Sequence, residues 1–136
     1  MTADIPLGLM VENCWVVDAG HTPLNWHSGV GEVLATPQMI GWMEATAVDV
    51  VDHLLPEGYR SVGINLDVRH LAATPVGAKV TVRATLIASE GKTLTFHVAA
   101  YDAAGLIGEG QHQRYIIQLE RFQARARARV GPESAS

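Results

Sequence analysis

Three polar side chains, Thr36, Glu44 and His70, are of types that can carry out proton transfer and nucleophilic attack. A carboxylate among apolar groups is poorly solvated, and is therefore more basic and more nucleophilic than one in water. Histidine can exchange a proton near neutral pH, and a threonine hydroxyl can hydrogen-bond an attacking group or an oxyanion. Thr36 and Glu44 are eight residues apart, and His70 follows Glu44 after 26 residues.

Glu44 is the most unusual of the three, because it falls on the apolar face of a predicted helix over residues 35–55. At 100° per residue its side chain lies within about 40° of four apolar ones, Ile40, Val48, Val51 and Leu55. An ionised carboxylate facing a core is costly unless it is paired. No Lys or Arg precedes Arg60, so the candidate partners are Arg69 and Arg114. A catalytic carboxylate and a structural ion pair both fit this pattern.

Thr36 and His70 also have ordinary structural explanations. Thr36 precedes Pro37, and threonine at the N-cap with proline at the first helical position is a common helix start. Taken alone, Thr36 therefore predicts a helix cap. His70 taken alone predicts an ordinary histidine at the end of a strand.

Alternating apolar residues predict β-strands on both sides of the helix. The expected strands span residues 9–17, 61–72, 78–89, 92–102 and 106–120, with turns at 90–91 and 103–105. A long loop over residues 18–35 joins the first strand to the helix. This order predicts an α+β protein in which a curled antiparallel sheet of about five strands wraps around one long central helix. That arrangement is the hotdog fold, whose usual form is a dimer with two sheets side by side.

Length and composition indicate one folded domain. The chain has 136 residues, of which 48% are hydrophobic and 18% charged. We expect a single domain over residues 1–120 and a basic, partly disordered tail over residues 121–136. No apolar run is long enough to span a membrane, and the first ten residues lack the features of a signal peptide. The expected location is therefore cytoplasmic.

The charges are unevenly distributed along the chain. The formal net charge of −4 argues against a nucleic-acid partner. Residues 1–59 contain eight acids and no bases, whereas residues 60–136 contain ten bases and six acids. The basic half could meet an anionic ligand such as a phosphorylated cofactor, although solvated sheet faces would give the same count. The arginines of the tail could likewise contact phosphates or remain solvated; they are Arg121, Arg125, Arg127 and Arg129.

Metal binding and an internal disulfide have no support in the sequence. The six histidines lack metal-ligand spacing, and Cys14 is the only cysteine. No glycine-rich phosphate loop is present. We expect neither a metal nor a bound cofactor.

Taken together, the three polar residues match a known family. The segments EVLATPQMIGWMEATAV, SVGINLDVRHLAATPVGAKVTVRATL and GLIGEGQHQRYIIQLERF resemble the fluoroacetyl-CoA thioesterases of the hotdog class. The resemblance covers about residues 32–122. It implies that Thr36, Glu44 and His70 form a catalytic triad for thioester hydrolysis, and that the backbone of Gly63 contacts the thioester.

The loop before the helix departs from the family pattern. The fluoroacetyl enzyme carries a Phe-containing lid here, whereas this chain has PLNWHSGVGEV, with Trp26 and no Phe. The resemblance thus implies hydrolysis of a small or medium acyl-CoA without strict specificity for the fluoroacetyl group. We expect Gly63, Trp26 and Arg114 to bind substrate.

Two other functions fit a hotdog protein. A hydratase or dehydratase acting on acyl-CoA would need an acid and a base placed for chemistry at the β-carbon, and no such signature is found. A non-catalytic acyl-CoA-binding protein would keep the pocket without needing a triad.

The helix itself predicts how the site is assembled. Eight residues from Thr36 to Glu44 span about 12 Å at 1.5 Å per residue, yet a reacting carbonyl must lie about 3 Å from its nucleophile and from its oxyanion donors. One helix cannot easily present both residues to one carbon unless Thr36 folds back toward its own Glu44. We therefore expect a homodimer with active sites at or near the interface, in which Thr36 of one chain approaches Glu44 of the other.

Overall fold

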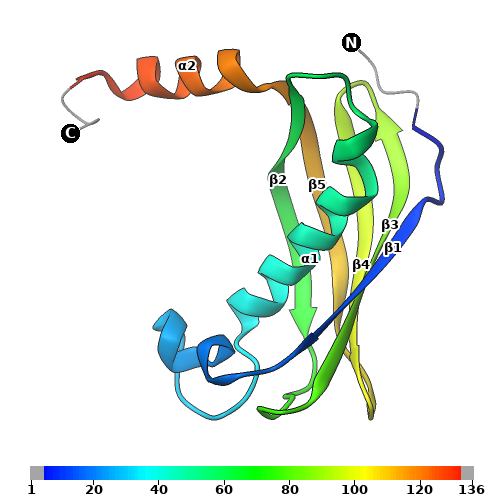
Figure 1. Ribbon diagram of the computed structural model, residues 1–136, viewed down its shortest axis with the longest axis vertical. Coiled ribbons are helices and arrows are strands. Elements are labelled where there is room, and N and C mark those ends of the chain that lie inside the picture. Colours follow the sequence, from blue (N-terminus) through cyan, green and yellow to red (C-terminus); the bar gives the residue numbers. More distant parts are fainter. Residues whose placement is uncertain (1–4, 133–136) are drawn as a thin grey trace.

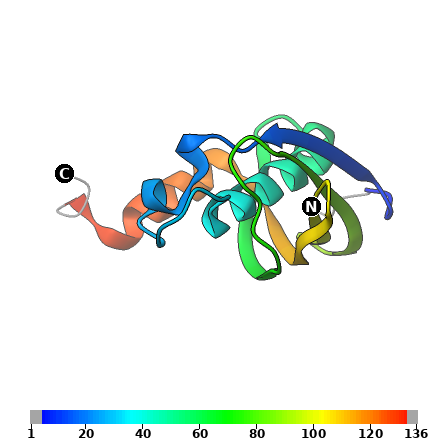
Figure 2. The ribbon, with the colours of Figure 1, turned by 90° about the horizontal axis from the view of Figure 1, so that it is seen from below.

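The computed structural model describes residues 5–132 and has the predicted α+β hotdog architecture (Figure 1). Five antiparallel strands form one sheet in the order β1-β3-β4-β5-β2. They are β1 (Met10–Val16), β2 (Tyr59–His70), β3 (Lys79–Glu90), β4 (Thr93–Asp102) and β5 (Gly105–Gln118). The sheet curls around the helix α1 (Thr36–Val51), as Figures 1 and 2 show from two directions.

Two further features of the chain order position the site. The strand β2 follows α1 but pairs with β5 rather than with β3, and it forms one edge of the sheet. Short 3-10 helices lie in the loop before α1, at Ala19–His21 and Pro23–Trp26, and after it, at Asp52–Leu54.

The strands β2 and β5 come unusually close at Gly110. An added Cβ there would lie 2.0 Å from the carbonyl oxygen of Asp67 on β2. Glycine at this position therefore allows β2 to approach β5 closely.

The core lies between one face of α1 and the concave face of the sheet. The buried face of the helix includes Met39, Met43, Ala47 and Val50. Trp42 stacks on Trp15 of β1, with ring centroids 4.9 Å apart. The sheet contributes a larger set of fully buried apolar residues, which includes Val80, Val82, Leu86, Leu94, Phe96 and Val98.

The predicted position of Glu44 within this core is wrong. Ile40, Glu44 and Val48 form a partly exposed stripe at the border of the buried face, and the Glu44 side chain is 41% exposed. Helical periodicity locates apolar residues around the axis, but the sheet covers only part of the circumference.

The start of the helix also differs from the prediction. The N-cap is Ala35, and Thr36 is the first helical residue with no side-chain capping hydrogen bond. The turn between β3 and β4 lies at residues 91–92 instead of 90–91, because Gly91 adopts the left-handed conformation, with φ at 60°.

The chain after β5 forms a helix, α2 (Leu119–Val130), which projects from the end of the sheet (Figure 1). The expected tail over residues 121–136 is therefore helical as far as residue 130, and its last four residues lie outside the described part of the chain. The predicted boundary at residue 120 falls inside this helix. Within residues 5–132, neither helix combines the length and apolarity needed to cross a membrane.

Candidate active site

Thr36 and His70 are brought together where α1 begins and β2 ends. The Thr36 hydroxyl, which is free of any capping role, lies 2.7 Å from Nδ1 of His70. Both residues line an open pocket of about 340 Å³, together with Pro23 and Leu34 from the loop before the helix and Leu71 after β2. The site therefore holds a histidine whose ring orientation is fixed by a threonine.

The second nitrogen of His70 is a strong functional indication. Nε2 is buried and hydrogen-bonds no residue between positions 5 and 132, which is uncommon for a buried polar atom. Burial lowers the pKa of His70, and the backbone of Ala72 opposes this effect more weakly. The ring is therefore neutral near pH 7, and Nε2 is available to exchange a proton with a bound molecule.

Glu44 lies elsewhere, beside Gly63 of β2. A Cβ added to Gly63 would lie 3.0 Å from Oε2 of Glu44 and 3.2 Å from Cε1 of His112. A larger residue here would therefore require Glu44 and His112 to shift by a few tenths of an ångström. A β-bulge between Gly63 and Asn65 bends the strand at this point, as is common next to active sites.

Arg114 is the cation beside Glu44, and Arg69 is not part of this contact. Nη1 of Arg114 is 3.9 Å from Oε2 of Glu44, and the Arg114 side chain is 8% exposed. This long contact neutralises charge without holding the carboxylate in a bidentate pair. Glu44 is thus partly solvated and is not locked in a close ion pair.

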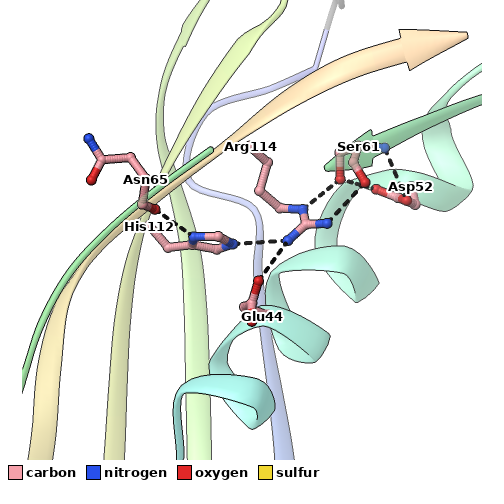
Figure 3. A network of polar contacts seen from close by, with 6 residues as sticks. All are labelled: Glu44, Asp52, Ser61, Asn65, His112 and Arg114. Atoms are coloured by element: carbon pink, nitrogen blue, oxygen red, sulfur yellow. Dashed lines mark hydrogen bonds and ion pairs between the residues drawn. The ribbon is translucent and has the colours of Figure 1, made fainter. Parts of the chain in front are cut away.

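The remaining donors of Arg114 are bound to neutral groups (Figure 3). Nε donates to the Ser61 hydroxyl at 2.7 Å and Nη2 donates to the Ser61 carbonyl at 2.9 Å. The Ser61 hydroxyl in turn donates to Asp52 at 2.5 Å, and the Ser61 backbone N–H donates to the same carboxylate at 3.2 Å. Burial lowers the pKa of Arg114, while the negative charges of Asp52 and Glu44 oppose this.

His112 is fixed as a neutral ring by this network. Arg114 can only donate, so Nε2 of His112, 2.9 Å from Nη1, must be the acceptor. The ring proton is then on Nδ1, which donates to the Asn65 carbonyl at 2.9 Å. Burial lowers the pKa of His112; the Asn65 carbonyl and the charge of Glu44 oppose this, and the charge of Arg114 reinforces it.

The predicted site residues thus fall into three places. Thr36 meets His70, and Glu44 meets Gly63 and Arg114. The helix separates the first pair from the second group by about 12 Å, and Thr36 does not fold back toward its own Glu44. Trp26, at the end of a 3-10 helix, is 45% exposed and does not line the pocket beside Thr36.

Sequence reasoning did not identify His112, Ser61 and Asp52. The alternation of β5 puts His112 on the same face as Arg114, and that of β2 puts Ser61 on the same face as Gly63. These signals become informative only once the register is known, in which Gly63 lies opposite Arg114.

The chain is similar to known proteins in sequence and in fold. The model of the fluoroacetyl-CoA-specific thioesterase family, FlK, matches residues 17–120. The fluoroacetyl-CoA thioesterase of Streptantibioticus cattleyicolor is 43% identical over 99 residues, which are 73% of this chain and 71% of that protein. A solved structure of the thioesterase FlK has a TM-score of 0.87 and 34% identity, and covers 96% of this chain and 100% of that one. A hot-dog-like protein from Thermanaerovibrio acidaminovorans also has a TM-score of 0.87, with 28% identity, and covers 94% of this chain and 95% of that one.

The curled sheet around α1 and these likenesses define a thioester hydrolase of the hotdog class. The chain belongs to the fluoroacetyl-CoA-specific thioesterase family, as the sequence resemblance predicted.

The buried histidines predict how stability depends on pH. The pKa values of His70 and His112 are lowered from the ordinary 6.5 in the folded chain. Below pH 6.5 the unfolded state therefore binds more protons than the folded state, and the free energy of unfolding decreases as the pH falls. The slope is up to about 1.4 kcal/mol per pH unit for each histidine. Above that pH neither histidine contributes a slope.

Melting temperatures of the wild type and of His112→Gln, measured between about pH 5 and 7, check this expectation. The variant should show a shallower loss of stability on acidification, whatever its stability at neutral pH. His53→Gln, at an exposed position, is the matched control and should keep the wild-type slope. An unchanged slope in His112→Gln would show that His112 titrates normally in the folded chain.

Proposed function

We propose that the protein hydrolyses the thioester of a small or medium acyl-CoA to the free acid and CoA, with Thr36, Glu44 and His70 as catalytic residues. The position of Glu44 carries the proposal. Its partly solvated carboxylate lies against Gly63 and 3.9 Å from Arg114, whose other donors are already bound. Such a carboxylate is not locked in a close ion pair and is still able to react.

The mechanism follows from the residue types. Glu44 either attacks the thioester carbonyl, giving a mixed anhydride that water then hydrolyses, or takes a proton from the attacking water. The C–S bond breaks, and the sulfur leaves as a thiolate. The proton released when water adds reaches this thiolate through Nε2 of His70, which is neutral before and after the transfer. Thr36 orients His70 through Nδ1. Backbone N–H groups near Gly63 stabilise the oxyanion. Arg114 helps to hold the substrate through its positive charge, which nearby Glu44 offsets in part.

The separation of the two groups supports a homodimer with shared sites. The strand β2 is an edge of the sheet, and it exposes Ile64 and Leu66, which are 53% and 43% accessible. An edge strand with exposed apolar side chains is a surface for pairing with another chain. Antiparallel pairing of two β2 edges about a two-fold axis would bring Thr36 and His70 of one chain toward Glu44 of the other.

The loop before α1 provides the acyl specificity in this proposal. Trp26 contacts the acyl group when the loop closes over the site. Its single bulky ring excludes long acyl chains less strictly than the Phe-containing lid of the fluoroacetyl enzyme would.

We also propose a cytoplasmic location, which fits the single free Cys14.

Hydrolysis is tested with a panel of acyl-CoA thioesters and a colorimetric thiol reagent. We expect CoA release from several small and medium substrates, and a preference for fluoroacetyl-CoA over acetyl-CoA below about 10³-fold, because shape alone discriminates small acyl groups modestly. A larger preference would contradict the assigned specificity. Hydration of an unsaturated acyl-CoA without thiol release would indicate a hydratase, and tight binding without turnover would indicate a binding protein.

Glu44→Gln should lower turnover by at least about 10²-fold, the usual scale for loss of a base or nucleophile. The fold should persist, because the change removes a charge and alters little volume. Steady-state kinetics and thermal unfolding measure the two effects separately, with Glu57→Gln at an exposed turn as the control. Wild-type turnover together with a lowered melting temperature would make Glu44 a structural ion-pair partner.

Shared sites are tested by mixing inactive variants. A dimer of one Thr36→Ala chain and one Glu44→Ala chain keeps one complete site of its two, so each mixed dimer should recover up to about half of the wild-type activity. Mixing Thr36→Ala with His70→Ala is the control, because both residues belong to the same group within one chain and no complete site can form. Recovery in neither mixture, with mixed dimers demonstrated, would mean that sites are not shared.

A further inference from the structure

Asp52 ends α1 at a position where a helix disfavours negative charge. It is the C-cap residue, and the last turn of the helix contains no basic side chain that would offset it. The free carbonyl groups at a helix C-terminus carry partial negative charge, so an acid there lowers the stability of the helix. Asp52 also forms no ion pair with a residue in positions 5–132. An acid at this position therefore has another structural reason.

Both carboxylate oxygens of Asp52 are bound by Ser61, the third residue of β2 (Figure 3). The Ser61 hydroxyl donates to Oδ1 at 2.5 Å, and the Ser61 backbone N–H donates to Oδ2 at 3.2 Å. Because the hydroxyl gives its proton to Asp52, its oxygen accepts from Nε of Arg114 at 2.7 Å. A continuous chain of hydrogen bonds thus runs from the end of α1 through β2 to Arg114 on β5.

This chain decides how the charge of Arg114 is divided between two carboxylates. Burial lowers the pKa of Arg114, and the charge of Asp52 opposes this more strongly than the charge of Glu44 does. Ser61 holds the guanidinium through Nε and Nη2, and His112 holds it through Nη1. Nη1 therefore stays 3.9 Å from Oε2 of Glu44, beyond the range of a hydrogen bond.

Without the charge of Asp52, Arg114 would lose the larger part of its compensation. A buried guanidinium that lacks a balancing carboxylate is strongly unfavourable. Glu44 is the other carboxylate that acts on the charge of Arg114, and a shift of about 1 Å would join the two in a hydrogen-bonded ion pair. An arginine in close contact makes a carboxylate a weaker base by about one to three orders of magnitude. Glu44 would then react more slowly with a thioester or with water.

We propose that Asp52, acting through Ser61, is a positioning residue for thioester hydrolysis, because it holds Arg114 back from Glu44 and keeps the Glu44 carboxylate available for reaction. Asp52 itself touches no reacting atom. This assignment rests on the proposed function, since it concerns the same carboxylate. It also explains why an acid occupies the end of α1, where the helix alone would disfavour it.

The first test removes the charge of Asp52 and keeps its shape. In Asp52→Asn we expect kcat to fall by about tenfold or more, while KM for the acyl-CoA changes by less than about threefold, because Arg114 remains beside the site. Asp52→Glu restores the charge and should recover kcat to within about threefold of the wild-type value. Asp49→Asn is the matched control, since Asp49 lies in the last turn of the same helix but binds Asn13, at 2.9 Å. It should change neither constant.

A double-mutant cycle with Glu44→Gln separates positioning from a purely structural role. If Asp52 acts through the Glu44 carboxylate, Asp52→Asn should change the residual turnover of Glu44→Gln by less than about twofold. A structural role would lower turnover by the same factor in both backgrounds. Ser61→Ala breaks the same chain of hydrogen bonds and leaves both charges in place, so it should also lower kcat. It replaces Asp52→Asn in the cycle if that variant does not fold.

Crystal structures make the test independent of turnover. In Asp52→Asn, Nη1 of Arg114 should lie within about 3.2 Å of a Glu44 oxygen. A distance that stays at 3.9 Å overturns the proposal even if hydrolysis is found, and so does an unchanged kcat, an equal loss in Asp49→Asn or an equal loss in the Glu44→Gln background. A shortened distance in a protein that releases no CoA supports the positioning of Arg114 by Asp52 and contradicts the hydrolytic function.

Discussion

The buried charge of Arg114 imposes most of the constraints on its surroundings. A guanidinium removed from water is tolerated only when its donors are bound and its charge is balanced. Here its N–H groups donate to both oxygens of Ser61 and to a nitrogen of His112. The carboxylates of Asp52 and Glu44 lie nearby. This requires β2 to pair with β5 in one register, requires His112 to remain neutral, and leaves little room beyond glycine at position 63, where a Cβ would lie 3.0 Å from Glu44 and 3.2 Å from His112.

How much could be predicted from the sequence depends on whether a feature is local. The strands and the central helix follow from periodicity, although periodicity placed Glu44 too deep in the core. The family resemblance follows from short segments. For Thr36 the local rule predicted only a cap, and it was the family resemblance that grouped it with His70, 34 positions away, whose Nδ1 lies 2.7 Å from its hydroxyl. His112 and Ser61 escaped notice because only the pairing of distant strands brings them to Arg114.

The helix α1 acts as a rigid spacer in the proposed mechanism. Its hydrogen-bonded backbone keeps Thr36 and Glu44 at a fixed separation, which movement of neighbouring loops cannot shorten. The proton-transferring pair and the reactive carboxylate are therefore two halves, each already organised by its own contacts. A second copy of the chain needs only to dock correctly, without reshaping either half.

The pairing of β2 with β5 has a consequence for folding kinetics. The strands β3, β4 and β5 are joined by short turns and can zip up locally, whereas the contact between Gly63 and Arg114 closes a loop of about 50 residues. Contacts of such sequence separation form late and slow the folding of β-rich domains. The surroundings of Glu44 therefore assemble only after the last strand has been synthesised and has docked, and a chain that stops before β5 contains every predicted catalytic residue but no organised site.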